Sequence, residues 1–202
     1  MSKKDQGIFR RLYLNGVKPE MPPKLKRGIV FNNVYILFFF LSLISGALFL
    51  YYLKGIGPLF WWVSILGFAY VPIYVLNGTN YYKVAMWLTT AVGSLSIFLA
   101  ATSVGQDANV QLFYITVAYS LFLNTINNRV LLVSQLLTVV FFIFLLYYTE
   151  FNIGFDAGID PKNLPIQRQY ALLTNFVLAL LLSYNYRTYY DDNLDKLERY
   201  FK

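Results

Sequence analysis

The stretch VFNNVYILFFFLSLISGALFLYYL, residues 30–53, decides the fold, because 24 consecutive positions carry no charged side chain. At about 1.5 Å of rise per residue, a helix of this length exceeds the roughly 30 Å hydrocarbon core of a bilayer. It follows a long polar segment and is too long for the apolar region of a signal peptide. The stretch therefore predicts a membrane-spanning helix that is not cleaved.

Five further apolar runs follow, separated by turn-forming Gly, Asn, Asp and Pro residues. They cover residues 59–76, 84–104, 110–123, 130–148 and 169–186. The run at 110–123 is short, so we expect its helix to continue from Asn124 to Asn128 and reach the membrane surface. Continuous apolar runs disfavour a β-barrel, whose strands alternate. The predicted fold class is an all-α membrane protein, a bundle of six transmembrane helices.

The net charge of +7 indicates orientation. If both termini are cytoplasmic, 14 of the 17 Lys and Arg residues lie inside, and only Lys54, Lys162 and Arg168 lie outside. This bias follows the positive-inside rule and disfavours nucleic acid as a partner. We expect a multi-pass protein of the cell inner (plasma) membrane with the bilayer as partner. The glycosylation pattern at 77–79 would then be cytoplasmic, and we set it aside.

The absence of His and Cys limits the chemistry of the chain. It excludes a Ser-His-Asp triad, a His-based zinc site, disulfides and a phosphoacceptor His. No charged residue lies in the middle of a predicted span, which argues against pumps, ion-coupled carriers and voltage sensors. We expect no enzyme activity, no catalytic residue, no metal site and no cofactor in this chain.

Neutral polar residues within the spans have two interpretations, a polar pocket or helix packing. Packing is favoured, through interhelical hydrogen bonds and small-residue spacings such as Ser42-x-x-x-Gly46 and Ser96-x-x-x-Ala100. Gln135 and Asn175 are too large for simple close packing. They are the first candidates for ligand binding.

The long external connection, from about residue 149 to 168, supplies the other candidate ligand-binding residues, Glu150, Asp156 and Asp160. Their carboxylates would meet a cation or a basic ligand. The spacing matches no calcium loop, and a solvated linker is the favoured alternative.

The segment before the first span predicts a short helix over residues 7–17, with apolar residues at helical spacing and a stop at Asn15-Gly16. We expect this helix to lie in the plane of the cytoplasmic headgroups. The alternative is a disordered basic tail.

The segment after the last span, residues 187–202, contains no helix breaker. A seam of apolar residues has the 4-3-4 spacing of a coiled coil and comprises Tyr190, Leu194, Leu197 and Phe201. The alternative is an amphipathic end on the membrane. Because the seam is open at Phe201, we expect a cytoplasmic output domain to follow.

Three patterns together resemble a known family: Asn15-Gly16-Val17 within 12–18, the basic run 24–27 followed by Asn32 and Asn33, and the terminal seam. The layout is similar to the six-helix membrane domain of bacterial class III adenylate or guanylate cyclases and sensor histidine kinases. That resemblance implies a homodimeric membrane anchor and receptor. The family's output residues are absent here, so no active site is carried over.

The chain then divides into a basic cytoplasmic tail (1–29), a six-helix domain (30–186) and the start of a signalling helix (187–202). The leading hypothesis is a sensory or regulatory membrane domain of a signalling enzyme, which transmits a signal through its C-terminal helix. The alternative is a small-molecule transporter or vitamin-binding membrane component.

Overall fold

A computed structural model describes residues 8–54, 57–104, 109–123, 128–151, 165–166, 168–169, 171–181 and 183. Throughout this part of the chain the regular structure is helical, and no strand occurs in it. The predicted all-helical fold is therefore confirmed.

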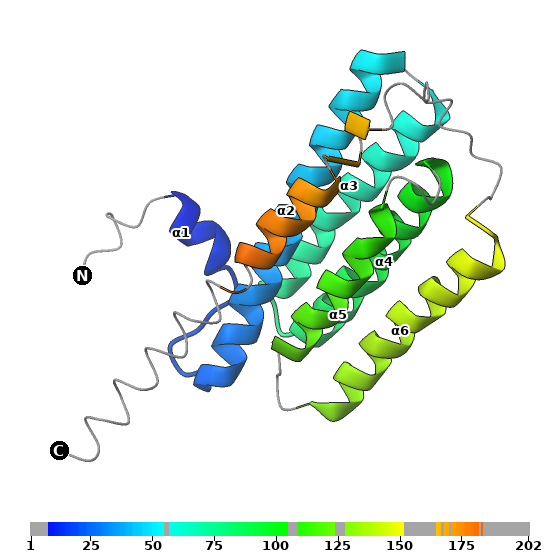
Figure 1. Ribbon diagram of the computed structural model, residues 1–202. Coiled ribbons are helices and arrows are strands. Elements are labelled where there is room, and N and C mark those ends of the chain that lie inside the picture. The colour runs from blue at the N-terminus through cyan, green and yellow to red at the C-terminus, as the bar shows by residue number, and fades with distance from the viewer. Residues whose placement is uncertain are drawn as a thin grey trace.

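The helices of the bundle run alternately up and down, as Figure 1 shows. The elements are α1 (Ile8–Tyr13), α2 (Pro23–Lys54), α3 (Pro58–Asn77), α4 (Tyr82–Val104), the 3-10 turn η3 (Val110–Leu112), α5 (Phe113–Leu123) and α6 (Arg129–Tyr148). A further apolar helical stretch, Ala171–Leu181, is called the terminal helix below. Four helices, α2, α3, α4 and α6, are long and apolar enough to cross a membrane, whereas the η3–α5 segment and the terminal helix are shorter.

Two helix boundaries differ from the prediction. The first long helix begins at Pro23, well before the uncharged run, because Pro suits the first helical position and the Lys and Arg residues that follow are good helix formers. Asn128 does not continue the preceding helix. Its backbone is non-helical, and its side chain accepts a 3.1 Å hydrogen bond from the backbone nitrogen of Leu131, so it caps α6.

The core is formed by buried residues of α2, α3, α4, α5, α6 and the terminal helix. Phe39 of α2 stacks on the fully buried Tyr70 of α3, with ring centroids 5.8 Å apart. Gly67 lets α3 approach α2 closely, because a Cβ there would lie 3.2 Å from Ile44. α4 packs against both α3 and α6 and is the most buried of the four long helices, whereas α6 lies at the edge of the bundle (Figure 1).

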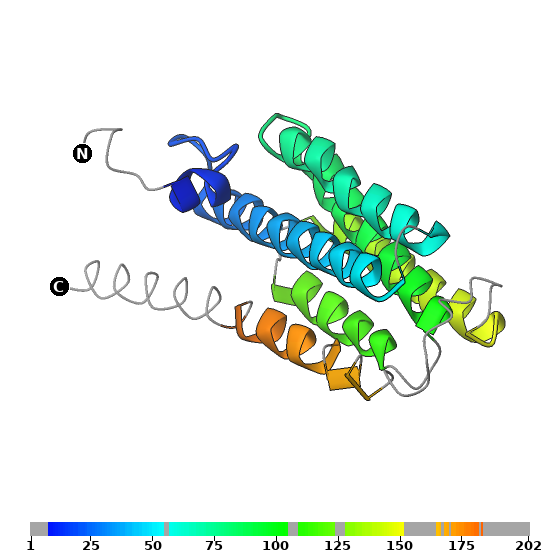
Figure 2. The same ribbon diagram turned by 90° about the horizontal axis from the view of Figure 1, so that it is seen from above.

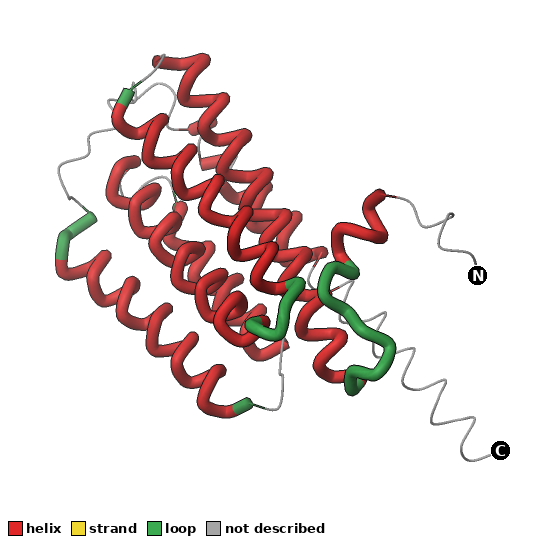
Figure 3. The backbone as a smooth tube through the Cα atoms, turned by 180° about the vertical axis from the view of Figure 1, so that it is seen from behind, coloured by secondary structure: helices red, strands yellow, loops and turns green. Residues whose placement is uncertain are grey.

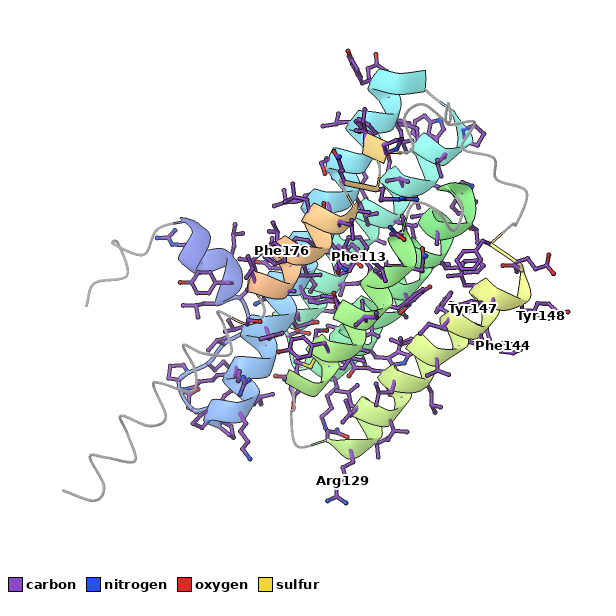
Figure 4. The ribbon with its side chains drawn as sticks, in the orientation of Figure 1. Phe113, Arg129, Phe144, Tyr147, Tyr148 and Phe176 are labelled. Carbon is purple, nitrogen blue, oxygen red and sulfur yellow. The ribbon has the colours of Figure 1, made fainter. Side chains whose placement is uncertain are left out.

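The surface of the bundle is apolar along its length. Figure 4 shows Arg129 at one end of α6, and Phe144, Tyr147 and Tyr148 toward the other. Tyr52 and Tyr148 are 87% and 75% exposed at the end where the aromatic belt is expected. An apolar exterior with aromatic ends is the surface expected of a membrane protein.

The alternating helix directions separate the described basic residues. The starts of α2, α4 and α6 lie at one end of the bundle, together with α1 (Figure 1). This end carries Lys24, Lys26, Arg27, Lys83 and Arg129, whereas Lys54 lies at the opposite end.

Candidate functional site: an asparagine cluster and an apolar cavity

Four asparagines join three separate segments at the basic end of the bundle. Asn32 and Asn33 project from α2, Asn77 is the last residue of α3, and Asn15 lies in the loop after α1. We call these four residues the asparagine cluster. Asn33 and Asn77 are fully buried, so their amides must find partners within the protein.

Asn77 is the centre of this cluster. Its side-chain nitrogen donates to the carbonyl oxygen of Ile29 (3.1 Å) and to Oδ1 of Asn33 (2.8 Å). Its own Oδ1 accepts a 3.0 Å hydrogen bond from the amide of Asn32. One side chain at the end of α3 therefore binds the first turns of α2 at three points.

The same cluster holds the segment that follows α1. The Asn33 amide donates to the carbonyl oxygens of Tyr13 (3.0 Å) and Asn15 (2.8 Å). The Asn15 amide donates to the carbonyl of Tyr74 (2.9 Å), and the Tyr74 hydroxyl donates to the carbonyl of Leu12 (2.7 Å). The α1 segment is therefore fixed to both α2 and α3.

Gly16 permits this close approach. Its φ of +80° is a left-handed conformation, and a Cβ there would lie 2.4 Å from the carbonyl oxygen of Asn77. Figure 3 shows the loop after α1 beside the turn that follows α3. A short helix, α1 (Ile8–Tyr13), lies within the expected range 7–17 and ends just before Asn15-Gly16, and its placement in the plane of the headgroups stays a prediction.

The second feature is a cavity of about 210 Å³ toward the other end of the bundle. It lies between α2, α3, α4, the η3–α5 segment and the terminal helix, and its walls are almost wholly carbon. The principal lining residues are Phe38, Phe39, Leu43, Gly46, Val63, Ile97, Ala100, Phe113, Ala171 and Thr174. In Figure 4 the labelled Phe113 lies between α5 and the terminal helix.

The two small-residue spacings line this cavity. Ser42, Gly46, Ser96 and Ala100 are all at its wall. A Cβ on Gly46 would have only Val63 near it, at 3.9 Å, so no helix backbone packs closely there. The small side chains of these spacings leave a hollow between the helices, where close packing was expected.

Most Ser and Thr hydroxyls in the described helices bond within their own helix. Thr89, Ser96 and Thr138, for example, each donate to the carbonyl four residues earlier. The expectation that these hydroxyls join neighbouring helices is therefore wrong for most of them. The local bond satisfies the hydroxyl without requiring a partner helix.

Gln135 and Asn175 do join helices, at separate places. Gln135 of α6 donates to the carbonyl of Met86 (3.0 Å) and to Oγ1 of Thr90 (2.9 Å), both on α4. It also lines a small polar void of about 10 Å³, which is room for about one water molecule. Asn175 of the terminal helix accepts a hydrogen bond from Thr116 of α5, and Figure 2 shows these two helices side by side.

The remaining predicted site residues lie apart from both features. Glu150 is exposed, with φ +49°, in the turn that ends α6. Asp156 and Asp160 lie outside the described residues, as does the predicted seam of Tyr190, Leu194, Leu197 and Phe201. Among the described residues, no group of three or more Asp or Glu side chains is placed to hold a metal ion.

No family model, curated protein or solved structure matches this chain. The asparagine cluster and the cavity are therefore the features that bear on function.

Asn77 is the residue of the asparagine cluster whose role was not predicted from the sequence. An amide directly after an apolar run was a usable signal, since such a side chain needs a partner when the end of the helix is buried.

Proposed function

We propose that this chain is the membrane anchor and sensory domain of a bacterial signalling protein. In this proposal six spans cross the inner membrane, with both termini cytoplasmic, and the 187–202 segment leads into an output domain, a nucleotidyl cyclase or histidine kinase. The chain itself carries no catalytic chemistry and acts as a homodimer.

The observation that carries this proposal is the composition of the cavity wall. Most of the wall comes from α2, α3, α4 and the η3–α5 segment, but Ala171 and Thr174 come from the terminal helix. Asn175, the next residue, is bonded to Thr116 of α5. A molecule in the cavity would therefore contact the helix that leads toward the C-terminus.

The asparagine cluster supports the same proposal by fixing one part of the bundle. α2 and α3 pack along their length and are bound together, and to the α1 segment, by the buried amides of Asn33 and Asn77. The terminal helix is joined to α5 by the hydrogen bond from Thr116 to Asn175. A ligand shifts the equilibrium only if it binds one helix arrangement more tightly than another, and the terminal helix is the element best placed to differ.

The alternative is a small-molecule transporter or vitamin-binding component, which would need a polar cavity near the midplane. The larger cavity is apolar, and the polar void beside Gln135 has room for only about one water molecule. Both observations favour the sensor over a carrier of polar substrates.

The test is a fusion of the full chain to a catalytic domain that is active only as a dimer. Leu194→Gln and Leu197→Gln place polar groups in the seam, and they should change the output activity at equal expression. The matched controls, Asp192→Asn and Lys196→Gln, alter positions outside the seam and should leave it unchanged. Activity that is indifferent to the two Leu substitutions would count against the proposal.

A further inference from the structure

The cavity walls favour a hydrocarbon occupant. None of the residues that line it is charged. The hydroxyls of Ser96 and Ser103 donate to the carbonyls of Val92 (2.7 Å) and Leu99 (2.6 Å) within α4. A polar ligand would lose its hydrogen bonds to water and gain few in return, whereas an apolar ligand would leave these bonds intact.

The shape of the cavity favours a chain over a compact ring. On α2 alone the lining residues run from Phe38 to Leu50, which is about 18 Å along the helix axis. The volume of about 210 Å³ exceeds the roughly 150 Å³ of an engineered apolar cavity that stays dry and binds benzene. An elongated cavity with apolar walls suits an extended aliphatic chain.

The position of the cavity gives such a chain a route of entry. Its upper end reaches Phe49 and Leu50 of α2 and Leu59, the second residue of α3. These residues lie at the end of the bundle marked by the exposed aromatics Tyr52 and Trp61. A polar headgroup at the interface could therefore remain solvated while its chain enters the cavity.

We propose that this cavity binds one aliphatic chain of a free single-chain amphiphile of the fatty-acid class. The choice of a free molecule rests on the proposed sensory function, because a sensor must respond to a compound whose concentration varies, and bulk phospholipid is always present. The chain contacts Ala171 and Thr174 and so stabilises one position of the terminal helix.

The test uses the full chain in nanodiscs of dioleoylphosphatidylcholine, with a diazirine-bearing palmitic acid as the photoreactive probe. Adducts mapped by mass spectrometry should lie on the cavity wall, at Phe38, Val63 or Phe113. An excess of unlabelled palmitic acid should compete with the probe and suppress these adducts, whereas the phosphatidylcholine of the nanodisc, which is always present in excess, should not.

Two substitutions fill the cavity, and one provides the matched control. Gly46→Phe enters open space, and Ala100→Phe enters from the α4 wall. Each should cause loss of labelling at the wall, because the phenyl ring occupies the space that the aliphatic chain would fill. Leu137→Phe adds a similar ring on the bilayer-facing side of α6, where Leu137 is 63% exposed, and should leave labelling unchanged. Circular dichroism establishes that each variant remains helical.

Three results would overturn the inference. One is labelling spread along the exposed helix faces and indifferent to Gly46→Phe and Ala100→Phe. Another is labelling of the wall by a diazirine phosphatidylcholine that excess palmitic acid cannot displace, which would assign the cavity to a bilayer lipid. The third is labelling of the wall that an excess of unlabelled palmitic acid does not reduce. These measurements need no output domain. The labelling can therefore be absent while the fusion responds, which would overturn only this inference. It can also be present while the fusion does not respond, which would count only against the proposed function.

Discussion

Asn77 at the end of α3 donates a 2.8 Å hydrogen bond to the side-chain oxygen of Asn33 on α2, and both residues are fully buried. This bond joins positions 44 residues apart. Through Asn33 it extends to the carbonyls of Tyr13 and Asn15. The basic end of the bundle is therefore built around amide groups, where a bundle held only by apolar packing would have none.

Asn77→Ala should lower the free energy of unfolding by about 1–3 kcal/mol, because it leaves buried groups of Asn32, Asn33 and Ile29 without their partner. Equilibrium unfolding in mixed detergent micelles measures this change. The matched control is Asn80→Ala, in the exposed turn, where the side-chain oxygen of Asn80 accepts a 3.4 Å hydrogen bond from Lys18. Equal destabilisation by both substitutions would show that the cluster has no special role.

Gly16→Ala should release the α1 segment while leaving the bundle folded. The new Cβ would meet the Asn77 carbonyl at 2.4 Å, and the φ of +80° would be strained for alanine. Limited trypsin digestion followed by mass spectrometry should show faster cleavage after Arg11. Gly57→Ala is the control, since nothing lies within 4 Å of a Cβ there, and it should be cleaved as the wild type is.

Gln135 and Thr90 should be energetically coupled across α4 and α6. A double-mutant cycle of Gln135→Leu and Thr90→Val should give a coupling energy of about 0.6–1.7 kcal/mol, the range typical of hydrogen bonds between membrane helices. Unfolding of the four proteins under identical detergent conditions supplies the values. Additive effects of the two substitutions would mean that the 2.9 Å contact contributes nothing to stability.

The absence of cysteine makes orientation directly measurable. In intact cells a membrane-impermeant maleimide should label Gly57→Cys, between α2 and α3, and should fail to label Thr79→Cys, between α3 and α4, until the cells are opened. The reason is the concentration of basic residues at the Thr79 end. The reverse labelling pattern would invert the proposed topology.

The extents of three helices could be predicted closely from the apolar runs. α3, α4 and α6 begin and end within two residues of the expected limits, because turn residues bound each run on both sides. The start of α2 was missed for a physical reason. Charge ends a membrane span, but Lys24 and Lys26 do not oppose helix formation, so the helix extends beyond the span.

The candidate site was less accessible to sequence reasoning. The motif around Asn15 and Asn32 stood out, yet its partner Asn77 lies more than 40 residues farther along the chain, beyond the reach of any local pattern. The spacing Ser42-x-x-x-Gly46 indicates only that the side chains are small. Whether a neighbouring helix fills the space beside these small side chains depends on the packing of the whole bundle. Here no helix fills it, and the space is part of the cavity.

The docking of the α1 segment also has a consequence for biosynthesis. The Tyr74 hydroxyl bonds to the carbonyl of Leu12, 62 residues earlier, so the acceptor is made long before its donor. At about 5 to 20 residues per second, the ribosome needs on the order of several seconds to make that interval. During this time the first residues can acquire no native partner on α3. The bonds from Asn33 of α2 to Tyr13 and Asn15 can therefore form first, and the N-terminal segment is joined to α3 only afterwards.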